Sequence, residues 1–454
     1  MPDTFASRLS SFLKAIAFCG AVLLTASSAS AQSNVPYYMG AVGGVSCDAR
    51  GVVTRATVTD LEQIRSELRG ALAPVASELA AESERRVVSL RGLEAELSKA
   101  TAAGKAIPDE VHYLAGLRRV EFVLVDAARH DILLVGPAEG WKVDGKGNIV
   151  GLKSELPVMQ LDDLLTALRS ADVQEVISCS IDPTPEGITR LRELNSQLGP
   201  GNAPQANAEA MSAALGEQTV TVTGVPAESH FARVLVAADF RMKSISLAFE
   251  PSPVRSLPSF LSMMNRSHTA AAPRFWLEPT YAEVVRNESG SAWRLAGSSV
   301  KAMSETEYVS ETGQRQATGR TDAASQRWTE RMTKSYPELA KREPVFAEVQ
   351  NCMDFAVVAA LLRQAELTRL AGYDFPVLFG KNGNVQTAEC VAPQRIPSGS
   401  NFVRQGNGTL YVSGGVALNP YSLLAQAKTD TAVETTLDLA VMSTPTHWWW
   451  EGGM

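Results

Sequence analysis

Residues Glu217–Pro258 read EQTVTVTGVPAESHFARVLVAADFRMKSISLAFEPSPVRSLP, and this stretch indicates the fold of the middle of the chain most clearly. Threonine and valine alternate over residues 219–223, as in a β-strand, and Gly224–Pro226 interrupts the alternation. Apolar residues then recur at helical spacing over residues 231–238, and alternation returns over residues 245–249. The pattern predicts a strand–helix–strand unit.

The segment on the N-terminal side mixes strand and helix patterns. Strand patterns alternate with turns over residues 119–150, in the manner of a β-meander, and helical patterns occupy most of residues 58–116. A helix, a strand and a further helix follow up to Leu198. This order predicts an α+β domain over residues 32–198.

The segments on the C-terminal side continue the α+β character, so the expected fold class is α+β with several domains. A chain of 454 residues exceeds the size at which one hydrophobic core usually stops growing. The expected division is a linker at 199–215, rich in Gly, Pro, Asn and Ala, a central α+β domain at 216–309, a polar loop at 310–327, and a C-terminal part of helix and strands at 328–454.

The first 31 residues have the pattern of a signal peptide. Arg8 and Lys14 precede the apolar run of Ala15–Ala26, and the small residues Ala29–Ala31 suit a cleavage site. We therefore expect export to the periplasm, the cell envelope or the outside, with cleavage after residue 31. The alternatives are an uncleaved tether or a lipid anchor at Cys19. No later segment is expected to span a bilayer.

The charge and the motifs exclude several classes of partner and cofactor. A net charge of −7 argues against nucleic acid, because binding to phosphates depends on Lys and Arg. Gly145–Gly151 has a glycine-rich pattern, but strand patterns lie on both sides of it, so it does not fit a dinucleotide loop. No pair of the five His has helical ligand spacing, and no Cys-x-x-Cys occurs. We expect neither a cofactor nor a metal.

The cysteines of the exported chain permit two interpretations. An even number of cysteines in an exported protein allows two disulfides, whose pairing the sequence does not fix. Free, buried thiols are the alternative, since a large chain needs no disulfides to fold. The candidate cysteines are Cys47, Cys179, Cys352 and Cys390.

Four polar residues in the predicted central helix form the candidate ligand site. The loop before the helix could offer free backbone N–H groups to an anion or a glycan, and nearby arginines would add positive charge. In the alternative interpretation, the serine caps the helix and the histidine packs in the core. Adjacent serine and histidine on a helix point about 100° apart, so no catalytic pair is assigned. The candidates are Ser229, His230, Arg233 and Arg241.

Five stretches together resemble a family of large exported proteins of unknown function, described mainly from planctomycete bacteria (domain of unknown function 1598). The resemblance implies an envelope or secreted setting. It carries over no functional residue, since the family has no assigned activity or ligand. The stretches are Tyr113–Val125, Asp131–Gly151, Ile177–Ile188, Gly224–Leu261 and Asn351–Leu362.

The sequence thus favours a binding or structural protein of the envelope, with an envelope protein or a glycan as the candidate partner. An exported hydrolase with an unrecognised site is the alternative. Trp448–Trp450 close the chain, and they suit either an envelope interface or packing against their own domain.

Overall fold

The computed structural model describes most of the chain after residue 71. The predicted signal peptide, residues 1–31, lies outside the described residues. The described residues are 41–42, 45–47, 53–55, 62, 66, 69–70, 72–170, 176–197, 204–264, 272–297, 300–310, 312–364, 366–381, 385–397, 402–405, 408–442 and 447–452.

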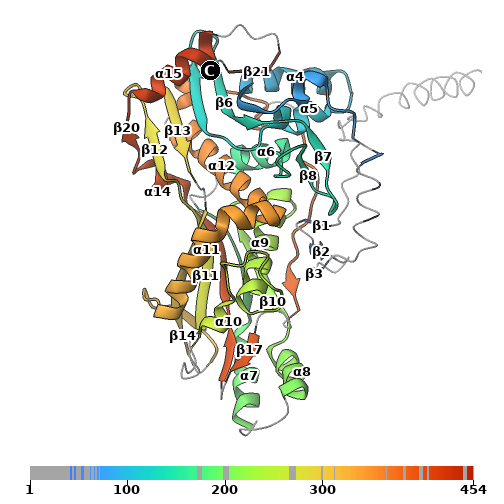
Figure 1. Cartoon of the computed structure of the whole chain (residues 1–454), viewed down its shortest axis with the longest axis vertical. Coiled ribbons are helices and arrows are strands. Elements are labelled where there is room, and N and C mark those ends of the chain that lie inside the picture. Colours follow the sequence, from blue (N-terminus) through green and yellow to red (C-terminus); the bar gives the residue numbers. More distant parts are fainter. Residues whose placement is uncertain are drawn as a thin grey trace, which may run out of the picture.

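Two seven-stranded mixed sheets organise the molecule, one in the upper and one in the lower part of Figure 1. The upper sheet has the order β20-β12-β13-β5-β6-β4-β21, with β4 Ser83–Ser89, β5 Phe122–Asp126, β6 Asp131–Ala138, β12 Glu283–Arg286, β13 Ala292–Ala296, β20 Lys428–Thr429 and β21 Trp449–Glu451. The lower sheet has the order β15-β14-β11-β19-β9-β10-β16, with β9 Ile177–Pro183, β10 Gln218–Thr223, β11 Ala272–Pro279, β14 Val300–Val309, β15 Arg315–Ala317, β16 Arg395–Ile396 and β19 Ser413–Leu418.

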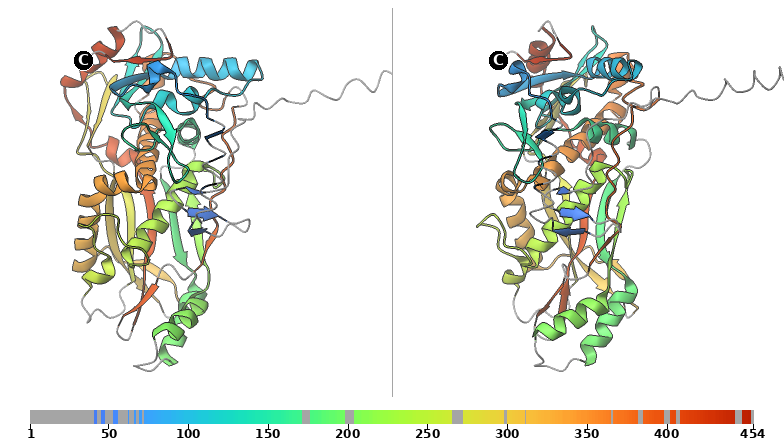
Figure 2. Two further views of the ribbon diagram at one scale, coloured as in Figure 1. Left: turned by 45° about the vertical axis from the view of Figure 1, so that its right-hand side comes forward. Right: turned by 90° about the vertical axis from the view of Figure 1, so that its right-hand side faces the viewer.

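The remaining strands form small sheets, and helices pack around the two large ones (Figure 2). The small sheets comprise β1 Ala41–Val42, β2 Val45–Cys47 and β3 Val53–Arg55; β7 Trp141–Val143 and β8 Ile149–Gly151; and β17 Phe402–Gln405 and β18 Gly408–Tyr411. The helices are α3 Ser77–Ala80, α4 Leu90–Ala102, α5 Asp109–His112, η1 Leu114–Gly116, α6 Leu161–Ser170, α7 Pro185–Gln197, α8 Pro204–Leu215, α9 His230–Ser246, α10 Phe260–Met263, α11 Ala323–Arg342, α12 Pro344–Gln364, α13 Leu367–Ala371, α14 Pro420–Leu424 and α15 Ala432–Met442.

The α+β class is confirmed, and each large sheet combines strands that are distant in the sequence. The upper sheet joins β4, β5 and β6 to β12 and β13, and then to the C-terminal β20 and β21. The lower sheet joins β9 to the central strands and to β16 and β19. The segments expected to form the N-terminal, central and C-terminal parts therefore share both sheets.

The central unit begins as expected, with strand β10 followed by helix α9. The strand expected over Ile245–Phe249 is wrong, because α9 continues to Ser246. Met242 and Ile245 are both buried, so the apolar face of the helix extends through the first part of that stretch. The next strand of the unit is β11, which follows the short helix α10.

Helix α8 occupies most of the stretch expected to be a linker. It packs against α7, and Ile188, Leu191, Met211 and Leu215 form a small separate core between the two helices. This helix pair lies at the lower end of the molecule in both figures. Alanine, which has the highest helix propensity, recurs through α8 and favours a helix there.

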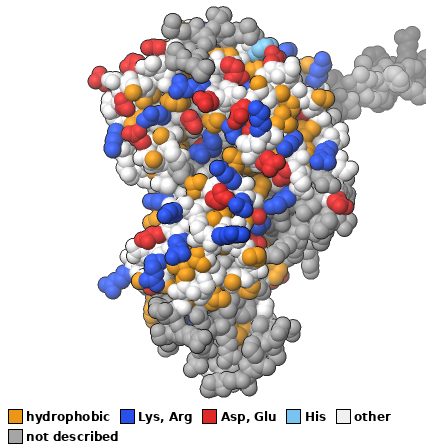
Figure 3. All heavy atoms as spheres, viewed as in Figure 1, with side chains coloured by type: hydrophobic (Ala, Val, Ile, Leu, Met, Phe, Trp, Pro, Cys, Tyr) orange, Lys and Arg blue, Asp and Glu red, His pale blue; other side chains and the backbone are white. Residues whose placement is uncertain are grey.

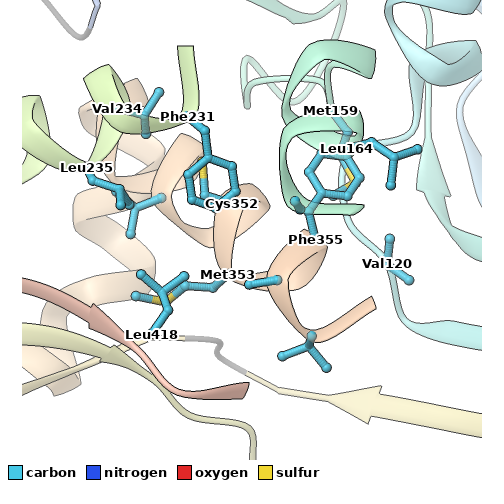
Figure 4. Close-up of a cluster of buried hydrophobic side chains, with 14 of the residues drawn as sticks. Val120, Met159, Leu164, Phe231, Val234, Leu235, Cys352, Met353, Phe355 and Leu418 are labelled. Atoms are coloured by element: carbon cyan, nitrogen blue, oxygen red, sulfur yellow. The ribbon is translucent and has the colours of Figure 1, made fainter. Parts of the chain in front are cut away.

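Helix α12 is the core helix of the molecule. Cys352, Met353 and Phe355 on this helix contact residues of α9 and α6, such as Phe231 and Leu164 (Figure 4). The helix is long and apolar enough to cross a membrane, but its most apolar window is 100% buried inside the protein. It therefore packs as the core helix of a folded domain, and its burial confirms the expectation for this apolar run.

The C-terminal tryptophans pack on their own domain. Trp449 and Trp450 belong to β21, which pairs antiparallel with β4 at the edge of the upper sheet, and both are buried. The guanidinium of Arg86 lies 5.2 Å from the ring centroid of Trp449 and donates hydrogen bonds to Glu451. These contacts attach the C-terminal strand β21 to β4.

Candidate functional site

Ser229 is the N-cap of α9. Its hydroxyl accepts a hydrogen bond from the backbone N–H of Ala232 at 3.1 Å and donates one to the carbonyl of Pro226 at 2.7 Å. The residue is 3% exposed, and both hydrogen bonds are internal. The capping interpretation of Ser229 therefore describes its contacts.

His230 makes a contact that the sequence did not suggest. Its Nδ1 lies 3.0 Å from each carboxylate oxygen of Asp163 on α6, and both side chains are buried. Burial alone would lower the pKa of His230, but the charge and the hydrogen bond of Asp163 raise it to about 10. His230 is thus a buried imidazolium paired with a carboxylate 67 positions earlier in the chain.

Further titratable groups surround this pair in the region where α5, α6, α9 and α12 pack together. Burial raises the pKa of Glu348 on α12 to about 7, although the charge of His230 opposes the shift. Burial likewise raises the pKa of Asp162 and lowers that of His112. These three residues, with His230 and Asp163, form what we call the buried polar cluster.

Arg233 and Cys390 adjoin the buried polar cluster. Nη1 of Arg233 lies 3.6 Å from Sγ of Cys390, and both residues are almost fully buried. The backbone N–H of Cys390 donates to the carbonyl of Glu228 at 2.6 Å, so this late segment runs along the start of α9. A thiol, an imidazole and a carboxylate thus lie in one neighbourhood.

Arg241 belongs to a different part of the molecule. Its guanidinium pairs with Glu250 at 2.7 Å and with Glu343 at 3.1 Å. Arg241 follows His230 by three turns of helix, which corresponds to about 16 Å along the axis. The structure therefore brings His230 and Arg233 near each other and leaves Arg241 outside that neighbourhood.

The sequence contained only weak indications of the residues that contact His230 and Arg233. The acidic pair Asp162 and Asp163 opens a predicted helix, where carboxylates commonly face solvent, but both side chains are buried. Cys390 was a candidate only for a disulfide. Cys179, Cys352 and Cys390 are free and buried, whereas the side chain of Cys47 lies outside the described residues.

A groove of about 550 Å³ lies between strand β14 and helix α11. Lys301–Ser304 line it on the strand side, and Gln326, Thr329, Glu330, Thr333 and Lys334 line it on the helix side. Figure 1 shows the two elements side by side at the edge of the lower sheet, where β14 pairs with β11 on its inner side. This groove could not be predicted from the sequence, because its polar lining residues are ordinary for a surface helix.

The described residues hold no group of three or more His, Cys, Asp or Glu side chains suited to a metal ion. Within the buried polar cluster, His230 contacts Asp163, whereas Nε2 of His112 and Oε2 of Glu348 have no hydrogen-bond partner among the described residues. In contrast to the buried polar cluster, the groove between β14 and α11 opens at the surface.

The fold and these sites define an α+β protein with two mixed sheets, a buried polar cluster and a surface groove. Residues 179–260, from β9 to the start of α10, match the family model "Protein of unknown function (DUF1598)". The match includes Ser229, His230, Arg233 and Arg241, and it confirms the resemblance to that family over this part of the chain. No curated protein and no solved structure matches the chain.

Proposed function

We propose that this chain is an exported protein of the bacterial envelope or its surroundings that binds a ligand in the β14–α11 groove. Its signal-peptide pattern and its resemblance to exported planctomycete proteins support the setting. The groove supports the binding role, because its exposed lining is mainly apolar and carries a few polar and charged side chains, as ligand sites commonly do.

The contacts of the α9 residues favour the groove over the first candidate site. Ser229 caps its helix, His230 pairs with Asp163, and Arg241 pairs with two glutamates. An external anion at these residues would have to displace internal partners. By comparison, Lys334 on the groove is exposed and forms no ion pair with any of the residues that the structure describes.

Capture of ligand from an envelope extract tests the binding role of the groove. Lys334→Glu reverses one charge at the groove, so we expect retention of the ligand to fall by about threefold to tenfold. Lys105→Glu, which changes an exposed lysine shortly after α4, a helix in the upper part of Figure 1, is the matched control and should retain the ligand. Equal retention by both variants would remove the groove from the proposal.

A second candidate function is thiol-dependent hydrolysis at Cys390. The observation in its favour is the thiol beside the His230–Asp163 pair and the Arg233 guanidinium. In such a reaction the thiolate attacks an acyl carbon and forms a thioester, while the imidazolium donates a proton to the leaving group. Water then attacks the thioester, which releases the acid and the thiolate and returns a proton to the imidazole. The burial of Cys390, at 2% exposure, argues against access of a substrate.

Alkylation with iodoacetamide at pH 7 tests whether Cys390 is reactive, as hydrolysis requires and ligand binding in the groove does not. We expect Cys179, Cys352 and Cys390 to resist modification in the native protein and to react in urea, because all three are buried and free. Peptide mapping by mass spectrometry identifies the modified residues. Rapid, selective modification of native Cys390 that is lost in Asp163→Asn would favour the hydrolase, and disulfide-linked peptides would contradict the free thiols.

A further inference from the structure

A second pocket lies between the β12–β13 hairpin, helix α14 and the C-terminal end of helix α12. Its volume is about 310 Å³, within the usual range for ligand pockets. Trp293 and Leu424, which are 4% and 7% exposed, contribute apolar surface, and Ala425 and Ala427 add more. Trp293 and Leu424 also belong to the main hydrophobic core, which fixes the shape of this part of the pocket.

Two polar side chains complete the lining, Arg286 on β12 and Gln364 at the end of α12. Arg286 lies opposite Trp293 in the register of the hairpin, and its guanidinium carbon is 5.8 Å from the centroid of the Trp293 ring. This cation–π contact holds the charge of the guanidinium beside the pocket and leaves its N–H donors available. Arg286 can therefore bind a ligand and keep its contact with the indole.

The donors of both polar side chains are unused within the described part of the chain. Neither the guanidinium of Arg286 nor the amide of Gln364 forms a hydrogen bond or an ion pair with a residue that the structure describes. Two carboxylates on neighbouring segments have other partners: Glu283 pairs with Arg294, and Oδ1 of Asp430 accepts from the first N–H of α15 at 2.9 Å. A positive charge with free donors thus borders the pocket.

The lining of the pocket indicates the class of ligand. Figure 3 shows acidic and basic side chains intermingled over the upper part of the molecule, and the net charge of the chain is −7, so the general surface does not attract anions. The guanidinium of Arg286 can form two parallel hydrogen bonds with one carboxylate, and the amide of Gln364 offers a further donor. The adjoining apolar surface favours a compact hydrocarbon body.

We infer that the pocket between β12, β13, α14 and the end of α12 binds a small organic carboxylate with a compact apolar body. The carboxylate pairs with Arg286 and accepts from the amide of Gln364, and the apolar body covers Trp293 and Leu424. This pocket shares no lining residue with the β14–α11 groove, so the inference goes beyond the proposed function.

Titrations followed by fluorine NMR test the inference on the purified chain lacking the predicted signal peptide. The probes are 4-fluorobenzoate and 4-fluorobenzamide, which have the same shape and differ in charge. For a ligand of this size we expect a Kd of 4-fluorobenzoate on the order of 1 mM. The neutral amide should bind at least about tenfold more weakly, because it forms no charge-assisted hydrogen bonds. Acetate, which has only a methyl group as its apolar body, should also compete at least about tenfold more weakly.

Three variants test the same contacts from the side of the protein. Arg286→Gln removes the guanidinium at an exposed position, and we expect it to weaken 4-fluorobenzoate at least about tenfold and to abolish the preference over the amide. Ala425→Phe places a ring at the pocket from an exposed position and should weaken both probes. Arg327→Gln, which changes an exposed arginine of α11, is the matched control and should bind as the wild type does. Circular dichroism verifies that each variant is folded, and the comparison of the two probes on the wild type decides the case if a variant does not fold.

The outcomes that would overturn the inference are distinct from those that would overturn the proposed function. Equal affinity for the two probes, or unchanged binding of 4-fluorobenzoate by Arg286→Gln, would contradict a carboxylate at Arg286. Absence of 4-fluorobenzoate binding up to about 10 mM would contradict the site altogether. Loss of 4-fluorobenzoate binding in Lys334→Glu but not in Arg286→Gln would place the carboxylate in the β14–α11 groove, which would support the proposed function and overturn the inference.

Discussion

Replacing Lys243 with methionine is expected to destabilise the protein by about 3–5 kcal/mol at pH 8. The ammonium group of Lys243 is 0% exposed and lies 2.9 Å from a carboxylate oxygen of Asp239, one helical turn away. It also donates to the carbonyls of Ile181 on β9 and Gly414 on β19. Lys243→Met would leave one buried carboxylate and two carbonyls without their donor, and it would loosen α9 from the lower sheet.

Urea denaturation followed by circular dichroism measures this loss. The double variant Asp239→Leu/Lys243→Met removes both charges, so we expect it to recover about 2 kcal/mol relative to Lys243→Met. Lys99→Met serves as the control, because the side chain of Lys99 is 76% exposed in its pair with Glu96, and it should change stability by less than about 0.5 kcal/mol. Similar effects of Lys243→Met and Lys99→Met would contradict the buried pair.

The pH dependence of the same pair has a defined sign. Burial raises the pKa of Asp239 to about 7, against the opposing charge of Lys243, from an ordinary value of 3.8. Between these two pH values the folded protein holds a proton on Asp239 that the unfolded chain has lost. The stability that comes from this proton is therefore fully present below about pH 4 and is lost as the pH rises through about 7. Asp239→Asn should therefore flatten the decline in stability between these two values.

The second large effect is expected at Asp163. Asp163→Asn removes the charge that holds His230 as an imidazolium, and it should cost about 3 kcal/mol at pH 6. The pKa of His230 is raised from 6.5 to about 10, so the stability from the pair is complete below about pH 6.5 and is lost as the pH rises toward 10. Wild-type protein should thus lose stability over this interval, and Asp163→Asn should lose much less.

Urea denaturation at pH 6, 8 and 10 compares the two chains. His447→Asn is the matched control, because His447 is half exposed, and its loss should leave the pH profile of the wild type unchanged. A pH profile for Asp163→Asn that parallels the wild type would show that His230 does not depend on Asp163 for its charge.

The sequence predicted those features that depend on neighbouring residues. The alternating threonines and valines of β10 form a strand, the apolar spacing after Ser229 forms α9, and Ser229 caps that helix. The apolar run within α12 is buried, as its composition required. In each case the determining interactions lie within a few positions of the chain.

Features that depend on distant residues could not be predicted in this way. The partner of His230 is 67 positions away, and the thiol beside Arg233 is 157 positions away. The alternating residues 245–249 were compatible with either a strand or a helix. Ile245 is buried in the core, and α9 continues through it to Ser246.

The most direct measurement of the central claim compares the groove with the α9 site in one capture experiment. Lys334→Glu and Arg233→Ala chains, both verified as folded, are each exposed to the same envelope extract, and the retained ligand is quantified by mass spectrometry. We predict that Lys334→Glu loses the ligand and that Arg233→Ala retains it. Loss with Arg233→Ala and retention with Lys334→Glu would contradict the account and return the binding site to the start of α9.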